Sequence, residues 1–226
     1  GYTNPGSLER ADALIDFETG RPAPGARDLL VRIKAVSVNP VDTKVRANRP
    51  VEGDSPVILG WDAAGEVVET GSDVTDFRQG DRVWYAGSID RPGTNCEYHL
   101  VDERIVSRAP VSLSDAEAAA MPLTSLTAYE MLFDRLRVVD EIPGAARAVL
   151  VIGGAGGVGS ITIQLLRALT GLTVIATASR PETKAWAEEL GAHHVIDHSA
   201  NLAEQVEALG IGAPGFVFSI THTHEY

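Results

Sequence analysis

The first half of the sequence consists of short apolar runs separated by turn residues. Runs of this length, bounded by Gly, Pro, Asn and Asp, are typical of β-strands rather than of helices. The pattern therefore predicts a β-rich domain that extends to about Pro110. The expected strands span residues 29–38, 63–69, 80–84 and 97–101.

From Ser114 onward the spacing of apolar positions becomes helical, and strands and helices then alternate. Such alternation predicts a parallel sheet whose strands are joined by crossover helices. The expected helices span residues 116–120, 128–136, 160–169, 182–190 and 202–209, and the expected strands span residues 148–152, 172–177, 194–197 and 216–220.

One turn in this second half has the pattern of a nucleotide-binding site. An apolar strand ends in closely spaced glycines, and a helix-like stretch follows. Gly154, Gly156 and Gly159 match the G-x-G-x-x-G pattern, which allows a tight turn, close approach of a pyrophosphate and close helix packing. A plain flexible turn can also contain such glycines. The strand before the turn, with the helix and second strand after it, favours a βαβ nucleotide site with phosphates at the helix N-terminus.

The end of the next strand bears on which dinucleotide binds. Sites that prefer NAD usually place Asp or Glu about 20 residues after the glycines, where it binds the ribose 2′-OH. Here Ser179 and Arg180 stand in place of the acid, and Pro181 opens the next helix. Because Arg180 can bind a 2′-phosphate bidentately and Ser179 can donate to it, we predict NADPH as the cofactor. The alternative is that Ser179 only caps the helix and Arg180 is a solvated charge.

Composition narrows the possible partners. The chain has 226 residues, of which 44% are apolar and 22% charged, with a net charge of −12. Its size allows a sizeable core and two domains, and its charge argues against a nucleic acid or an anionic membrane as partner. The single cysteine, Cys96, excludes an intramolecular disulfide and suits a reducing compartment. With no signal peptide or membrane span visible, we predict a cytoplasmic protein that binds a small-molecule substrate.

The predicted parallel sheet has fewer strands than expected. A doubly wound dinucleotide-binding sheet has about six strands, whereas four are readable before Tyr226. The last of them, at 216–220, leads to the terminus with no helix after it. We therefore expect the sequence to be a fragment of a chain that runs on the order of 100 residues further.

Several segments of the chain form a recognisable series together with the glycine turn. They are AVSVNPVDTKVR at 35–46, LGWDAAG at 59–65, GDRVWY at 80–85 and AAAMPLTSLTAY at 118–129. In this order, over nearly the whole chain, they resemble the medium-chain dehydrogenase/reductase superfamily, and within it the quinone oxidoreductase branch with its bacterial zinc-type alcohol dehydrogenase-like proteins. The resemblance implies a GroES-like, partly open β-barrel as the catalytic domain at 1–122 and an incomplete Rossmann domain, a doubly wound parallel α/β sheet, at 123–226. We also expect a homodimer.

The zinc ligands of related dehydrogenases are missing from this sequence. By the resemblance, the catalytic Cys, His and Cys of zinc-dependent relatives align with Asn39, Trp61 and Leu123. None of these is a usable ligand in such a set. The four cysteines of the structural zinc lobe are absent as well, and we interpret the histidines between 193 and 198 and at 222 and 224 as structural or solvated. We therefore expect no metal.

The resemblance also assigns roles to individual residues. It places Asn39 against the nicotinamide or the substrate, the alternative being a loop-stabilising Asn. Thr127 is similar to a threonine that contacts the nicotinamide carboxamide, although it is also compatible with a helix cap. Tyr85 is the aromatic candidate for the substrate wall, with ordinary packing at a strand end as the alternative. For the cofactor, the implied contacts are Gly156, Gly157 and Val158 at the pyrophosphate, and Ser179, Arg180 and Lys184 at the 2′-phosphate.

Taken with the missing zinc ligands, these residues predict a zinc-independent, NADPH-dependent reductase of quinones or conjugated enones. Negative charge that develops on such an acceptor is delocalised and needs only a few hydrogen-bond donors, whereas oxidation of a simple alcohol gains several kcal/mol from a Lewis-acidic metal. No residue stands out as an obligatory acid or base, so solvent can supply the proton. One alternative is a non-catalytic NADPH-binding protein that acts as a redox sensor or structural protein. Another is a zinc-type alcohol dehydrogenase that uses unrecognised ligands.

Overall fold

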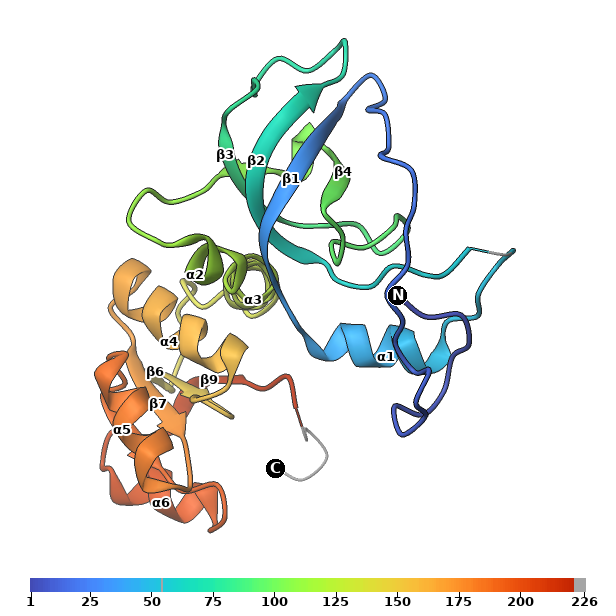
Figure 1. The fold of residues 1–226 in the computed structure, drawn as a ribbon. Coiled ribbons are helices and arrows are strands. Elements are labelled where there is room, and N and C mark those ends of the chain that lie inside the picture. The colour runs from blue at the N-terminus through green and yellow to red at the C-terminus, as the bar shows by residue number, and fades with distance from the viewer. Residues whose placement is uncertain (54, 222–226) are drawn as a thin grey trace. The chain divides into compact units, whose positions relative to one another are not determined.

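The computed structural model describes residues 1–53 and 55–221, so His222 and His224 lie outside the described residues. The chain forms two compact units, Gly1–Leu123 and Thr124–Tyr226. Each is a separate fold, and Figure 1 shows the elements of both. The described helices include none that is long and apolar enough to cross a bilayer.

The first unit is built on a five-stranded antiparallel sheet in the order β4-β1-β2-β3-β5 (Figure 1). The short apolar runs bounded by turn residues predicted four of these strands, and β5 was not expected. The strands are β1 (Asp28–Ser37), β2 (Asp62–Thr70), β3 (Arg82–Ala86), β4 (Tyr98–Asp102) and β5 (Ser107–Arg108). The core side chains that result are Leu29, Val31, Val67, Val83 and Val101, all fully or almost fully buried.

Four helical segments accompany this sheet and lead toward the second unit. They are α1 (Pro40–Asn48), the 3-10 turn η1 (Glu103–Ile105), α2 (Asp115–Ala119) and α3 (Pro122–Tyr129), the last of which continues as the π-helical turn η2 (Glu130–Arg135). Helix α1 was not expected from the apolar pattern. It begins with Pro40 at its first position, and the Asn39 N–H donates to Asp42 Oδ2 at 2.7 Å. A proline at the first position with an acid in the first turn is the local signal that could have predicted it.

The second unit is a four-stranded parallel sheet in the order β8-β7-β6-β9. This is the order of the first four strands of a doubly wound dinucleotide-binding fold, with the change of direction between β6 and β9. The sequence predicted its strands and crossover helices to within a few residues. They are β6 (Ala146–Val151), α4 (Gly157–Leu169), β7 (Thr173–Thr177), α5 (Pro181–Glu189), β8 (His194–Ile196), α6 (Leu202–Ala208) and β9 (Pro214–Phe218).

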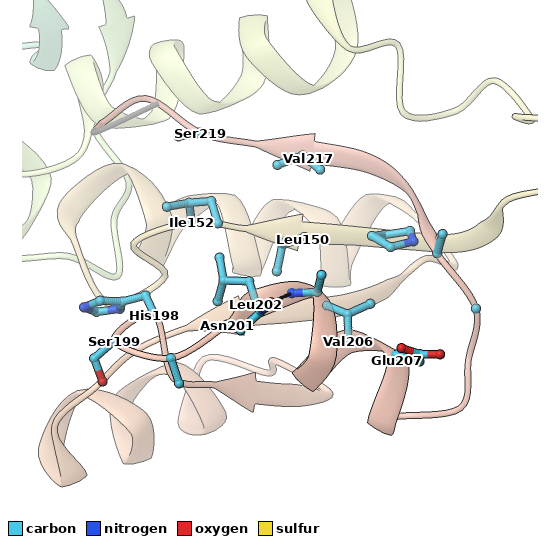
Figure 2. Close-up of a pocket in the computed structure, with 15 residues that line it drawn as sticks. Leu150, Ile152, His198, Ser199, Asn201, Leu202, Val206, Glu207, Val217 and Ser219 are labelled. Carbon is cyan, nitrogen blue, oxygen red and sulfur yellow. Dashed lines mark hydrogen bonds between the residues drawn. The ribbon is translucent and has the colours of Figure 1, made fainter. Parts of the chain in front are cut away.

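The two faces of this sheet are covered to different extents. On one face, α4 and α5 pack on Val149, Val151 and Phe218, all buried. On the other face, α6 packs on β6 and β7 and leaves a cavity of about 940 Å³ beside β9. Figure 2 shows this cavity, with His198 at one end and Glu207 at the other. The face that α6 covers is therefore only partly closed among the described residues.

Candidate functional site

The glycine turn is held against the neighbouring strand by two hydrogen bonds. The Gly153 N–H donates to Thr177 Oγ1 at 2.9 Å, and the Gly154 N–H donates to the Thr177 carbonyl at 3.0 Å. Gly153 itself has φ of +70°, which favours glycine. The turn follows β6 and Thr177 ends β7, and these strands are parallel neighbours, so both lie at the same edge of the sheet. The fold thus brings the predicted pyrophosphate turn and the predicted specificity segment to one edge.

Two of the motif glycines leave no room for a side chain. A Cβ on Gly154 would lie 2.7 Å from the Ala176 Cβ on β7. A Cβ on Gly159 would overlap the carbonyl oxygen of Gly153. These contacts correspond to the tight turn and the close helix packing that the G-x-G-x-x-G pattern requires. Here glycine is demanded by packing and not only by flexibility.

The start of α4 is shaped to receive an anion. Gly156 is its N-cap and makes no side-chain capping bond, and Gly157, Val158 and Gly159 form the first turn. The N–H groups of a first helical turn lack partners within the helix, and the helix dipole adds positive potential there. The side chain of Val158 packs toward the core, so it does not block these groups. The residues at this turn therefore fit the pyrophosphate of a dinucleotide.

After β7, a serine and an arginine occupy the positions where an NAD-preferring site has an acid. Ala178 is buried, Ser179 is half-buried and Arg180 is exposed. The N-cap of α5 is Arg180, so the alternative in which Ser179 caps this helix is wrong. Pro181 opens the helix as predicted. The Arg180 guanidinium lies 3.1 Å from the carboxylate of Glu182, and both side chains are largely exposed.

Lys184 has a carboxylate partner that the sequence did not reveal. Its ammonium lies 3.1 Å from Asp197 Oδ2, just beyond the end of β8. Hydrogen bonds from Ser199, together with this ammonium, hold the pKa of Asp197 at about 2. Asp197 therefore stays ionised, and the Lys184 charge is partly balanced before any phosphate binds.

In the first unit, Asn39 belongs to a buried hydrogen-bond cluster. Its Nδ2 donates to Asp62 Oδ2 at 2.8 Å, and the Leu123 N–H donates to Asp62 Oδ1 at 2.8 Å. The Thr94 hydroxyl donates to the Asp62 carbonyl at 3.2 Å. Asp62 is 0% exposed and Asn39 only 8%. Asp62 was not predicted from the sequence, although it directly follows Trp61, one of the three positions that align with zinc ligands of relatives.

The environment of Asp62 opposes its ionisation. Burial raises the pKa of this carboxyl to about 6, and the nearby charge of Asp42 acts in the same direction. The hydrogen bonds from Asn39 and Leu123 act in the opposite direction, since they stabilise the ionised form. A buried carboxyl that titrates close to neutral pH is unusual for a purely structural residue, so this cluster is a candidate functional site.

The side chains at the zinc-ligand positions do not fit zinc. Asn39 offers an amide, Leu123 a hydrocarbon and Trp61 an indole, whereas zinc takes thiolate, imidazole or carboxylate ligands. Trp61 is 4% exposed and packs with Tyr2, and its Nε1 has no hydrogen-bond partner in the described part of the chain. Both Asp62 oxygens already accept hydrogen bonds. Among the described residues, no group of three His, Cys, Asp or Glu side chains could hold a metal ion.

The structure places Tyr85 in the core of the first unit. Tyr85 is 2% exposed, and its hydroxyl lies 2.9 Å from His99 Nδ1. His99 Nε2 lies 2.9 Å from the Pro92 carbonyl, which can only accept, so Nδ1 accepts from the Tyr85 hydroxyl. Burial lowers the pKa of His99 and keeps the ring neutral. This arrangement favours the packing role that the sequence left open for Tyr85.

Thr127 and Cys96 lie in different units. Thr127 is half-buried on α3, in the second unit. Cys96 is partly buried in the first unit, and burial raises the pKa of its thiol to about 11. A thiol with so high a pKa is a poor nucleophile, in agreement with its interpretation as a small packing residue.

Two family profiles match the two halves of the chain. The one described as alcohol dehydrogenase GroES-like domain matches residues 25–111, and the one described as zinc-binding dehydrogenase matches residues 157–224. A zinc-type alcohol dehydrogenase-like protein of Staphylococcus aureus is 42% identical over the whole chain, which covers 67% of that protein. The 2-methylene-furan-3-one reductase of Solanum lycopersicum is 36% identical over 88% of the chain and 51% of its own length.

Solved structures agree with this assignment. A Rhizobium etli protein, described provisionally as a zinc-dependent alcohol dehydrogenase, is 61% identical with a TM-score of 0.97 and covers 100% of this chain and 66% of its own. The Escherichia coli quinone oxidoreductase complexed with NADPH is 31% identical with a TM-score of 0.70, over 87% of this chain and 57% of its own. The chain thus spans about two thirds or less of the length of these relatives.

The barrel, the parallel sheet and the glycine turn are those of a two-domain nicotinamide-dependent oxidoreductase. The chain belongs to the medium-chain dehydrogenase/reductase superfamily, among the quinone oxidoreductases and zinc-type alcohol dehydrogenase-like proteins.

Changing Gly159 to Ala tests the nucleotide turn. The added Cβ collides with the Gly153 carbonyl, so α4 must shift away from the turn. We expect the affinity for NADPH and for NADH to fall by roughly tenfold or more, since one misplaced phosphate contact is worth about 1.5–3 kcal/mol. Isothermal titration of the full-length protein measures this. The matched control is Gly171→Ala, whose Cβ would point into open space. Unchanged cofactor affinity in Gly159→Ala would contradict the assignment of the turn.

Proposed function

We propose that this protein is a zinc-independent, NADPH-dependent oxidoreductase that transfers a hydride to a quinone or a conjugated enone. The observation that carries the proposal is the Asn39–Asp62 hydrogen bond at a position where zinc-dependent relatives have a metal ligand. The nucleotide turn of the second unit supports the binding of a dinucleotide. An oxidoreductase that binds the cofactor without metal ligands needs a substrate that accepts hydride without Lewis-acid assistance.

The cofactor, when bound, supplies the hydride. The N–H groups of Gly157 and Val158 would hold the pyrophosphate, and Ser179, Arg180 and Lys184 would hold the 2′-phosphate. This assignment rests on the uncapped start of α4 and on the cations that follow β7. The carboxylates of Glu182 and Asp197 lie 3.1 Å from Arg180 and Lys184, so a 2′-phosphate would compete with them for these cations.

As the family resemblance implies, the proposed role of Asn39 is to contact the nicotinamide or the substrate, and that of Thr127 is to contact the nicotinamide carboxamide. When a quinone or an enone accepts a hydride, the negative charge that develops is delocalised over the conjugated system. A small number of neutral hydrogen-bonding groups is sufficient to stabilise it. We propose that solvent supplies the proton, because none of the residues assigned to the nicotinamide or the substrate stands out as an obligatory acid or base.

The names of the relatives support this choice of substrate. The tomato protein is named as a reductase of 2-methylene-furan-3-one, which is a conjugated enone, and the Escherichia coli protein as a quinone oxidoreductase with NADPH bound. For this chain, the cofactor preference and the acceptor remain proposals that the following experiments test.

Turnover of NADPH by the full-length protein tests the reaction itself. With a panel of quinones and conjugated enones, we expect saturable oxidation of NADPH, followed by absorbance of the reduced nicotinamide. Simple primary alcohols with NADP⁺ serve as the contrast and should give no comparable rate, because no metal stabilises the alkoxide. If the protein binds NADPH and oxidises it with none of the acceptors, it is a non-catalytic NADPH-binding protein instead.

Arg180→Ala tests the cofactor preference. A charge-assisted hydrogen bond contributes about 1.5–3 kcal/mol, so we expect the affinity for NADPH to fall roughly ten- to a hundredfold. Affinity for NADH, which lacks the 2′-phosphate, should stay nearly unchanged. The matched control is Arg147→Ala, an exposed arginine at the opposite end of the sheet, near the start of β6. Equal affinity of the unmutated protein for the two cofactors would refute the preference.

Metal analysis tests the zinc-independent route. We expect purified full-length protein to contain no stoichiometric zinc and to keep its activity in a chelator, because Asn39, Trp61 and Leu123 provide no ligand set. Elemental analysis alongside a chelator titration decides this. One tightly held zinc per chain, with activity lost on its removal, would show that other residues bind the metal.

A further inference from the structure

The hydrogen bond between Asn39 and Asp62 determines how the Asn39 side-chain amide is oriented. An ionised carboxylate can only accept hydrogen bonds, whereas an amide has one end that donates and one end that accepts. Asn39 therefore has to turn its NH₂ group toward Asp62 Oδ2, 2.8 Å away. Its carbonyl oxygen, Oδ1, then points away from Asp62. The charge on Asp62 decides which end of the amide is presented outward.

The backbone around this pair is held in place, so the side-chain amide is the part that can reverse. The Asn39 N–H donates to Asp42 Oδ2 at 2.7 Å, and Pro40 follows as the first residue of α1. On the other side, Asp62 begins β2 and pairs with Ser37 on β1 and Ala86 on β3. An amide reversal is a rotation about a single side-chain bond and needs no movement of these elements.

We propose that Asp62 is a positioning residue that sets the orientation of the Asn39 amide: ionised Asp62 makes Asn39 present its carbonyl oxygen, and protonated Asp62 makes it present its NH₂ group. The proposal rests on the proposed function, in which Asn39 contacts the nicotinamide or the substrate. In this proposal, the protonation state of Asp62 determines whether the Asn39 amide accepts a hydrogen bond from the bound molecule or donates one to it.

The proton has one suitable place on Asp62. Oδ1 accepts from the Leu123 N–H, a backbone donor that cannot reverse. A proton taken up from solvent therefore sits on Oδ2, and the new hydroxyl must donate to an acceptor. Reversal of the Asn39 amide places its Oδ1 opposite that hydroxyl and keeps one hydrogen bond between the two residues.

The surroundings of Asp62 place this change close to neutral pH. From α1 it is faced by the carboxylate of Asp42, which raises its pKa, and from α3 by the neutral Leu123 amide, which lowers it. The Thr94 hydroxyl bonds the backbone carbonyl of Asp62 and not its carboxyl. The strand neighbours of Asp62, Ser37 on β1 and Ala86 on β3, are uncharged. Burial is the largest effect and brings the pKa of Asp62 to about 6. Below that pH the reversed amide is populated.

The orientation can be measured directly in the full-length protein without substrate. With ¹⁵N labelling, the Asn39 side-chain NH₂ signals are identified by their loss in Asn39→Ala and are then followed across the pKa of Asp62, about 6. We expect them to shift with a midpoint near that value, and to lose that midpoint in Asp62→Asn. Asn48, whose Nδ2 donates to the Lys44 carbonyl on the exposed side of α1, is the internal control and should not titrate there.

Kinetics then test whether the orientation matters for the reaction. Asp62→Asn should lower kcat by roughly tenfold to a hundredfold, the size of effect that a misoriented group causes, and remove any inflection of kcat near pH 6. Asp62→Glu, which keeps the carboxylate, should restore part of kcat and a pH inflection. Glu69→Gln, an exposed acid on the same strand, is the matched control.

The outcomes separate this inference from the proposed function. The positioning role is refuted if the Asn39 side-chain NH₂ signals of the unmutated protein do not shift across the pKa of Asp62. It is also refuted if Asp62→Asn keeps the kcat and the pH profile of the unmutated protein. If Asp62→Asn does not fold, the titration of the unmutated protein alone decides. If Asn39 titrates as expected and no acceptor is reduced, the amide switch stands and the proposed reaction is refuted.

Discussion

The carboxylate of Asp62 ties together three segments that are far apart in the sequence: the loop before α1, the start of β2 and the start of α3. A buried charge is costly unless hydrogen bonds satisfy it, so the segments that donate to it are held where it lies. The second unit uses the same device with a neutral group. There, Thr177 accepts from Gly153 and Gly154 and keeps the nucleotide turn beside the end of β7. In both units, loops that carry candidate functional groups are anchored to a rigid strand.

Most of the second unit could be predicted from the sequence because its signals are local. Strand and helix periods, the glycine spacing and Pro181 at a helix start each depend on a few neighbouring residues. The strand order follows from the right-handed crossover rule and the nucleotide-binding pattern together. Four strands of the first unit could be predicted as well, because short apolar runs bounded by turn residues are also local signals.

What the sequence could not predict depends on contacts between distant residues. Asp62 meets Leu123 across 61 positions, and Tyr85 meets His99 across 14. No periodicity encodes such pairs. The sequence predicted Arg180 as a cation after β7. It did not predict the carboxylates of Glu182 and Asp197 beside Arg180 and Lys184, because the conformations of α5 and of the turn after β8 place them there. Helix α1 was overlooked because it carries few buried apolar residues, and its local start signal was the only one available.

The packing of Trp61 has a consequence for how this site can change over evolution. The indole fills a pocket against Tyr2, Val45 and Leu59, and replacing so large a buried side chain with a smaller ligand typically costs about 3–5 kcal/mol. A route from this sequence to a metal enzyme would need three substitutions on three segments, and the Trp61 step brings that cost before a complete ligand set exists to offset it. The buried indole therefore makes the gain of a metal site at this position costly in stability at its first step.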